Sequence, residues 1–181
     1  MKNLVIILLV SLVSFGCKTN EARKPLSTKS GSYIKESAKL NKKLVEQERA
    51  TIEAFISQQS DKQFIASENG FWYSYDTKVE QDTIKADFGD TINFDYNLKH
   101  LNGETIYSKA SIGNRDYVME KEILFTGLRE GLKLMKPGED VTFVFPSYTA
   151  YGYYGDDKKI GTNVPLISEV TLNSITQNNN D

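Results

Sequence analysis

The sequence has few of the residues that most catalytic and metal-binding sites need. Its 181 residues include one cysteine, Cys17, and one histidine, His100. A zinc site takes three or four Cys, His or carboxylate ligands, so a single histidine cannot supply one. A Cys–His dyad is formally available, but the position of Cys17 indicates another use for that residue. We therefore expect neither a metal nor a cofactor.

The chain also lacks an excess of charge of either sign. It carries 22 basic and 24 acidic residues, for a formal net charge of -2, and the two signs are interspersed. Nucleic-acid-binding domains usually gather Lys and Arg in one patch or stripe, so a nucleic-acid partner is not expected. Hydrophobic residues, Tyr included, make up 39% of the chain. On the usual scale, which counts Gly and not Tyr, exchanging the 10 Tyr for the 12 Gly gives about 40%. Typical domains have roughly 45–50% apolar residues on that scale, which indicates that part of this chain stays outside the core.

The first seventeen residues are typical of an export signal. Their apolar segment, Leu4–Val13, is shorter than the roughly 20 residues that span a bilayer. The only cysteine, Cys17, follows Gly16, and this resembles the cleavage site of a bacterial lipoprotein. The sequence thus predicts a palmitate-bearing Cys17 and a protein anchored to the outer membrane, with the periplasmic face favoured. The alternative is a secreted protein with a free thiol at its start.

A tether and a long helix are predicted next. Residues 17–32 are polar and include Pro25 and Gly31, as flexible linkers often do. Apolar residues then recur at helical spacing between residues 33 and 60. They are Ile34, Ala38, Val45, Ile52 and Ile56. This helix can dock on the following domain, act as a spacer or pair with a second copy. Docking or a spacer is favoured because sustained strong heptads are missing.

From residue 61 onward the pattern indicates one domain rich in strands. Short alternating segments are separated by Asn69-Gly70 and Asn102-Gly103, which are typical hairpin turns. One segment with helical spacing, Ile123–Met135, interrupts them and predicts a helix over one face of the sheet, an α+β arrangement. The predicted organisation is a signal (1–16), a tether (17–32), an amphipathic helix (33–60), a folded domain (61–176) and a polar tail (177–181).

The segment around the short helix carries a family pattern. It runs from Gly127, through Glu130-Gly131 and Met135, to Gly138-Glu139. It resembles the FKBP-type peptidyl-prolyl isomerases, in which a Gly-x-x-Glu-Gly helix leads through Met-x-x-Gly-Glu into a strand. Other pieces agree in order: Gly89-Asp90-Thr91, Tyr96, Asn102-Gly103, Ala150-Tyr151-Gly152 and Asn163-x-Pro165-Leu166-Ile167-x-Glu169-Val170-x-Leu172. The resemblance covers about residues 64–175 and implies an antiparallel, strongly curved sheet wrapped on one short helix. Loop 147–161 is similar to the gliding-motility-associated lipoprotein branch.

The resemblance also implies a proline-binding pocket. Its residues would be Tyr96, Ile106, Leu124, Phe125, Leu128 and Tyr151. The Tyr151 hydroxyl is expected to face the ligand carbonyl, the backbone N–H of Phe125 to be available to the substrate, and Leu128 to form the floor. Further pocket residues would be Tyr107, Tyr117 and Ser168. Without the family pattern, Tyr96 and Phe125 would be interpreted as ordinary core aromatics, and Asp156–Lys159 as a solvated turn.

Two positions depart from the family pattern. Tyr107 stands where an Asp is usual, and Ser168 stands where the last strand usually inserts a pocket Phe. Ser168 also interrupts the apolar face of its own strand. A wider, wetter pocket and weaker catalysis are therefore expected, and Ser168→Phe should raise activity if space is vacant there.

The predicted function is a lipid-anchored prolyl isomerase that assists folding of cell-envelope or secreted proteins, with gliding motility as a candidate process. Its partners would be proline-containing polypeptides and the membrane. Rotation about a peptide bond faces a barrier of about 18–20 kcal/mol, yet lowering it requires no nucleophile or metal. The alternative is a non-catalytic FKBP-like binding module of an envelope motility or secretion assembly, which Tyr107 and Ser168 favour.

Overall fold

The computed structural model describes residues 30–81 and 84–178, and the chain divides into two units, Met1–Leu40 and Asn41–Asp181. One long helix, α2 (Ser30–Gln58), crosses that boundary. It begins at Ser30, within the predicted tether. Its side chains from Tyr33 to Leu40 are exposed, whereas Ile52, in the second unit, is fully buried. The predicted signal and the predicted lipidation site, Cys17, lie outside the described residues.

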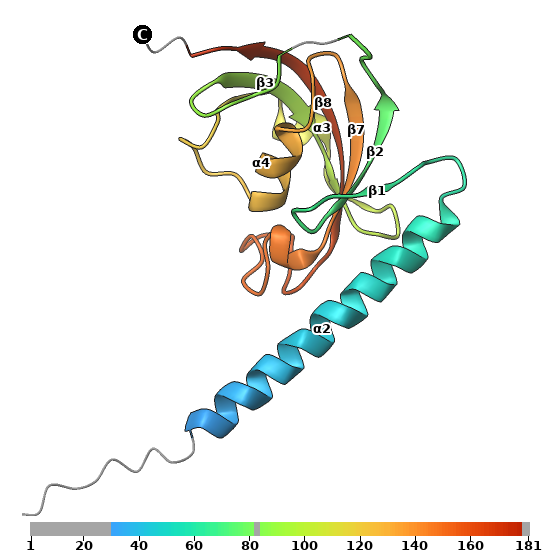
Figure 1. The fold of residues 1–181 in the computed structure, drawn as a ribbon, viewed down its shortest axis with the longest axis vertical. Helices are drawn as coiled ribbons and strands as arrows, with labels where there is room; N and C mark the ends of the chain where they lie inside the picture. Colours follow the sequence, from blue (N-terminus) through green and yellow to red (C-terminus); the bar gives the residue numbers. More distant parts are fainter. Residues whose placement is uncertain (1–29, 82–83, 179–181) are drawn as a thin grey trace, which may run out of the picture. The chain divides into compact units, whose positions relative to one another are not determined.

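The second unit is organised around one open antiparallel sheet of eight strands (Figure 1). Six strands follow one another in the order β1-β2-β7-β8-β3-β6, while β4 pairs with β5 and β8. The strands are β1 (Ile65–Ala66), β2 (Trp72–Thr77), β3 (Thr91–Tyr96), β4 (Leu98–Lys99), β5 (Thr105–Tyr107), β6 (Arg115–Val118), β7 (Asp140–Phe145) and β8 (Leu166–Thr176). The predicted α+β class with a curved antiparallel sheet is confirmed. Among the described residues, no helix is both long and apolar enough to cross a membrane.

The helix α4 (Thr126–Leu132) lies against the inner face of the curved sheet (Figure 1). It is shorter than the predicted segment Ile123–Met135. Phe125 has φ -64° and ψ 144°, an extended conformation, and acts as the N-cap residue. Ile123 is 97% exposed and lies before the helix begins. The helical spacing of apolar residues therefore predicted a longer helix than the one that forms.

Two glycines let α4 approach strand β7 closely. A Cβ atom on Gly127 would lie 2.6 Å from the ring of Phe145, and one on Gly131 would lie 2.8 Å from the ring of Phe143. Real Cβ atoms essentially never come this close to another heavy atom. The Gly-x-x-Glu-Gly pattern therefore has a packing reason, because any larger residue would push the helix off the aromatic strand.

Strand β7 alternates between two cores. Val141, Phe143 and Phe145 belong to the large inner core, whereas Val144 belongs to a small outer cluster. The rings of Phe143 and Phe145 stack with centroids 5.4 Å apart. On the outer side Val144 packs with Ile167 and with Ile52 of α2. The end of α2 thus contributes to the fold of the second unit.

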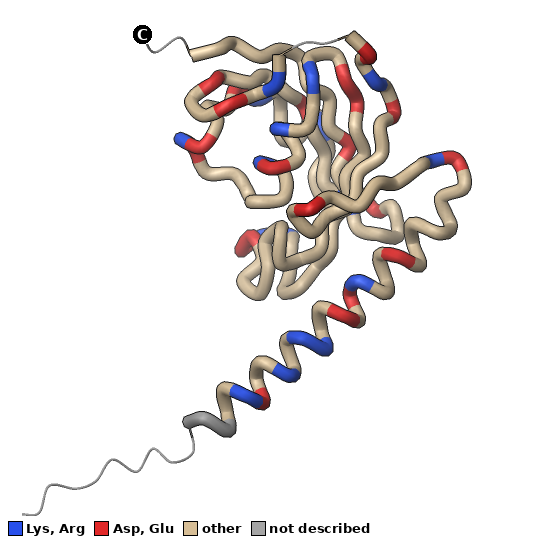
Figure 2. Tube along the Cα trace, in the orientation of Figure 1, with Lys and Arg blue, Asp and Glu red and all other residues tan. Residues whose placement is uncertain are grey.

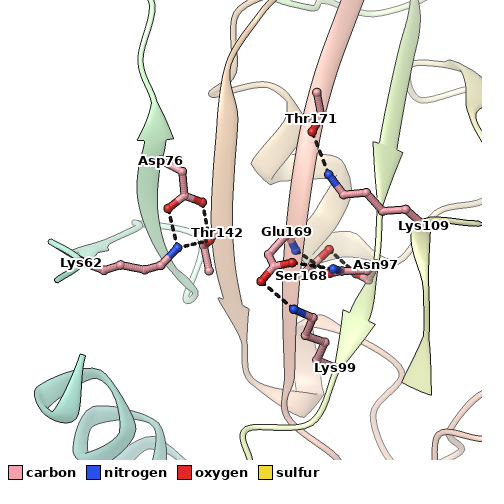
Figure 3. A network of polar contacts seen from close by, with 9 residues as sticks. All are labelled: Lys62, Asp76, Asn97, Lys99, Lys109, Thr142, Ser168, Glu169 and Thr171. Atoms are coloured by element: carbon pink, nitrogen blue, oxygen red, sulfur yellow. Dashed lines mark hydrogen bonds and ion pairs between the residues drawn. The ribbon is translucent and has the colours of Figure 1, made fainter. Parts of the chain in front are cut away.

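A network of polar contacts lies on the outer side of the sheet (Figure 3). The Lys99 amino group lies 2.7 Å from the Glu169 carboxylate, and the Lys62 amino group contacts Asp76 and lies 2.8 Å from the Thr142 hydroxyl. Figure 2 shows basic and acidic residues interspersed along the described chain. The outer face therefore combines paired charges with one small apolar cluster.

Strands β3 and β4 are separated by a single residue, Asn97. This residue is buried. Its side-chain amide donates to the Glu169 carboxylate at 2.6 Å, and its side-chain oxygen accepts from the Glu169 N–H at 2.9 Å. The Ser168 hydroxyl donates to the Asn97 carbonyl at 2.7 Å. These bonds hold the break between Tyr96 and Leu98, both of which face the site described next.

Candidate functional site

A pocket of about 370 Å³ opens between β3, β5, β6 and the loop that precedes β8. Its lining combines three tyrosines with charged and aliphatic side chains. The lining residues are Tyr96, Leu98, Tyr107, Ser111, Ile112, Arg115, Tyr151, Asp156 and Lys158. Three of the residues named from the sequence, Tyr96, Tyr107 and Tyr151, are therefore brought together, although they come from three separate segments of the chain.

Tyr96 reaches the pocket because it ends the inward-facing row of strand β3. Ile92, Phe94 and Tyr96 are buried while the residues between them are half-buried. The rings of Phe94 and Tyr96 stack with centroids 5.4 Å apart. Two-residue alternation places all three on one face, so Tyr96 is a core aromatic on one side and a pocket wall on the other.

Tyr151 contributes a protonated hydroxyl. Its ring lies against Phe125, with centroids 5.2 Å apart. Burial, reinforced by Tyr96, Asp156 and Tyr107 nearby, raises the pKa of Tyr151 to about 12, and Arg115 opposes the shift. The phenol therefore keeps its proton at neutral pH and can donate a hydrogen bond.

Tyr107 and Asp156 form one side of the pocket. The Tyr107 hydroxyl donates to the Asp156 carboxylate. The other carboxylate oxygen accepts the N–H groups of Lys158, Lys159 and Ile160 at 3.0, 2.9 and 2.7 Å. Burial opposes ionisation of Asp156, but these hydrogen bonds prevail and lower its pKa, while the bond to Asp156 raises the pKa of Tyr107. Asp156 is thus a structural acceptor at the site, although the turn around it was interpreted as merely solvated.

Arg115 brings a positive charge to the pocket. It lies on β6, where Arg115 and Tyr117 share a face and Tyr117 is fully buried in the inner core. Tyr117 instead donates its hydroxyl to the carbonyl of Glu122 at 3.2 Å. The sequence reasoning named Tyr117 and missed Arg115. The two-residue alternation was the signal that could have found it, since the residue two positions earlier points the same way.

The other residues named from the sequence lie beneath or beside the pocket. Leu128 is fully buried in the inner core, Ile106 is buried, and Leu124 and Phe125 are partly buried against that core. The backbone N–H of Phe125 precedes α4 and is not used by the helix ladder. Ser168 is fully buried, with its hydroxyl bonded to Asn97, and does not line the pocket. The structure thus gives no support to the widening expected at Ser168.

An open antiparallel sheet curved around one short helix, with an aromatic pocket at its inner edge, places the second unit in the α+β class. The sequence profile of the FKBP-type peptidyl-prolyl cis-trans isomerases matches residues 82–173. The chain belongs to this family.

Individual relatives agree with that assignment. The chain is 26% identical over 121 residues to a probable FKBP-type peptidyl-prolyl cis-trans isomerase, FkpA, of Neisseria meningitidis serogroup B. That alignment covers 66% of this chain but only 43% of the relative.

Two solved structures share the fold. One is a peptidyl-prolyl cis-trans isomerase from Pseudomonas syringae pv. tomato, with a TM-score of 0.60 and 19% identity over 75% of this chain and 96% of that one. The other is FkpA from Escherichia coli, with a TM-score of 0.59 and 22% identity over 97% of this chain and 82% of that one.

Proposed function

We propose that this chain is a peptidyl-prolyl cis-trans isomerase whose substrate enters the pocket of Tyr96, Tyr107 and Tyr151. The observation that carries the proposal is the Tyr151 hydroxyl. The raised pKa of Tyr151 keeps this hydroxyl protonated, and Tyr151 lines the pocket. The Tyr151 ring packs against the Phe125 ring, with centroids 5.2 Å apart. This is a donor suited to a peptide carbonyl oxygen.

The chemistry needs only binding and a change of environment. Resonance keeps the X-Pro bond planar, and uncatalysed isomerisation takes tens to hundreds of seconds. The twisted amide has less charge separation than the planar form, so an aromatic, water-poor pocket favours it. Tyr96 supplies such a wall. A hydrogen bond from Tyr151 to a substrate carbonyl, and one from the backbone N–H of Phe125, would hold the peptide while the bond turns.

A protease-coupled proline-peptide assay on the chain tests this proposal. Acceleration of the cis-to-trans step above the uncatalysed rate is expected, and its loss on blocking the pocket with excess proline peptide is the control. No acceleration at any protein concentration would contradict it.

A second candidate is a binding module without catalysis, and the polar half of the pocket favours it. Arg115 and the Tyr107–Asp156 pair make this half more polar than an aromatic wall would be, and polar surroundings stabilise the planar, polar amide. Tight binding of a proline peptide without acceleration would support this candidate over the first.

We further propose that Cys17 is lipidated and anchors the protein on the periplasmic face of the outer membrane. Clients would then be cell-envelope or secreted proteins. One acyl chain binds membranes only marginally, but a bacterial lipoprotein carries several, so anchoring should be firm. Radioactive palmitate should label the wild-type chain and not Cys17→Ser. Absence of label on the wild type would contradict the anchor.

The link to gliding motility is a narrower proposal, supported by the similarity of loop 147–161 to that branch of lipoproteins. Deletion of the protein should stop surface gliding, and the Tyr151→Phe variant should restore it only in part if isomerisation is the activity required. Unimpaired gliding after deletion would remove this part of the proposal.

A further inference from the structure

A hydrogen-bonded link joins helix α2 to the loop that carries Tyr151. The carboxylate of Glu48 accepts the backbone N–H of Ser147 and, at 2.8 Å, the Ser147 hydroxyl. The two residues are 99 positions apart in the sequence and lie within the same unit, Asn41–Asp181. Both bonds are charge-assisted, which makes them stronger than neutral hydrogen bonds.

Ser147 in turn holds both neighbours of Tyr151. Its carbonyl accepts the N–H of Ala150 at 3.0 Å and the N–H of Gly152 at 2.8 Å. The first bond fixes the planar peptide unit between Thr149 and Ala150, and the second fixes the unit between Tyr151 and Gly152. Gly152 has φ +60°, a conformation that glycine adopts at no steric cost. The direction in which the Tyr151 ring leaves the backbone therefore depends on where Ser147 is held.

Glu48 is presented from a helix that is itself held in place. Ile52 lies one turn after Glu48, on the same side of α2, and is fully buried against Val144 and Ile167 of the sheet. The loop has another tie, to the turn between β1 and β2, because the Tyr148 hydroxyl donates to the carbonyl of Gly70 at 3.1 Å. The buried Ile52 thus fixes the part of α2 that carries Glu48, so the Glu48 carboxylate is held close to Ser147.

We propose that Glu48 is a positioning residue for the isomerase site. It holds the turn 147–152 so that the Tyr151 hydroxyl points into the pocket, and it makes the second half of α2 part of the working site. The kinetic consequence rests on the proposed isomerase function. The structural consequence, a turn ordered by Glu48, does not.

Without the carboxylate, the Ser147 N–H and hydroxyl lose their shared acceptor. The buried core of the sheet is untouched by this change, so the turn should loosen locally and the strands should not. If the contact only stabilised the fold, its loss would instead make the whole domain open more often. Local and global opening are separable by hydrogen exchange, which reports each amide by itself.

The test compares three variants of the full chain: Glu48→Ala, Glu48→Gln and the matched control Glu46→Ala. Glu46 lies on the same helix, is exposed and is paired with Lys42 at 3.9 Å. For Glu48→Ala, exchange at the amides of Ala150 and Gly152 should rise by about tenfold or more, since bonds to charged groups are the stronger ones and 1.4 kcal/mol is tenfold. Exchange in β7 and β8 should not change.

The kinetic arm uses a proline peptide with kcat and KM measured separately. In Glu48→Ala, kcat/KM should fall by about 2- to 12-fold, because mispositioning the Tyr151 hydroxyl can cost at most the one hydrogen bond that it donates. Glu48→Gln should be intermediate, because an amide oxygen still accepts one of the two bonds. Glu46→Ala should match the wild type in both arms.

Unchanged exchange at Ala150 and Gly152 in both Glu48 variants would overturn the proposal. If the wild type is active and the Glu48 variants show faster exchange but the same kcat/KM, the proposal is also overturned, because the turn would then not position Tyr151. If the wild type shows no isomerase activity, the proposed function fails, but exchange and peptide affinity still decide whether Glu48 orders the turn. If Glu48→Ala does not fold, Glu48→Gln supplies the same comparison.

Discussion

The two faces of the sheet are built by different rules, and strand β7 shows both. Its inward residues, Phe143 and Phe145, meet aromatic rings and the glycines of α4. Its outward residues, Thr142 and Val144, meet an ion pair and the side chain of Ile52. The inner face is one continuous apolar core with a pocket at its edge. The outer face is a set of separate contacts brought from distant parts of the chain.

The largest expected effect lies on the inner face. Phe143→Ala should lower the free energy of unfolding by about 3–5 kcal/mol, through lost burial and a cavity beside Gly131. Urea unfolding of the variant measures it. Activity should fall only as the folded fraction falls. A loss below about 1 kcal/mol would mean that the inner core is less continuous than its packing indicates.

The outer face should respond less. Ile52→Ala should lower the free energy of unfolding by about 2 kcal/mol, the lower end of the range for such truncations, because its cluster is small and most of the residues packed around Ile52, Val144 and Ile167 are only partly buried. Ile34→Ala is the matched control. Ile34 is 69% exposed, so its effect should stay within about 0.5 kcal/mol. Equal effects at the two positions would show that α2 does not stabilise the fold of the second unit. The burial of Ile52 indicates that residues 61–176 would be less stable without the helix.

A substitution at Ser168 tests whether the space beside this residue is vacant or filled. Because its side chain is fully buried and bonded to Asn97, Ser168→Phe should overpack the core and destabilise the chain by about 1–3 kcal/mol. Thermal unfolding and the proline-peptide assay together measure it. A rise in activity without loss of stability would show that the space at this position is empty, as the sequence predicted.

Tyr151→Phe should leave the fold nearly unchanged and weaken the site. It removes one hydrogen bond, worth roughly 0.5–1.5 kcal/mol net, and keeps the ring against Phe125. Activity or peptide affinity should fall by about 2- to 12-fold. If instead the variant unfolds as readily as Phe143→Ala and binds peptide normally, Tyr151 belongs to the core and not to the site.

The smallest effect concerns pH. Hydrogen bonds lower the pKa of Asp156 in the folded chain, so its contribution to stability is present above the unfolded value of about 3.9. That contribution is lost as pH falls through the lowered folded-state pKa. Asp156→Asn should therefore cost more stability at pH 7 than at pH 3, by urea unfolding at both values. An equal cost at both would show that the charge of Asp156 is unimportant.

The inner face was accessible to sequence reasoning because its signals are local. Alternation in 92–96 and in 141–145 predicts which side chains face inward, and the glycines at 127 and 131 carry the family pattern. The helix bounds were less accurate, since Ile123 and Met135 continue the apolar spacing of α4 without being part of it.

The polar half of the site and the outer face were not predictable in the same way. Arg115, Asp156 and the bond between Glu48 and Ser147 depend on which distant segments meet, and no local period encodes that. Ser168 shows the same limit. Its family position suggested a gap in the pocket, whereas its hydroxyl is used to hold the break at Asn97.

The most direct test of the account is where a proline peptide binds. Titration of the isotopically labelled chain with a short X-Pro peptide, followed by amide chemical shifts, distinguishes the two faces of the sheet. We predict that the shifts cluster at Tyr96, Tyr107 and Tyr151 and spare Lys62 and Lys99 on the outer face. Shifts confined to the outer face, or none at a peptide concentration that saturates other family members, would contradict the assignment of the pocket.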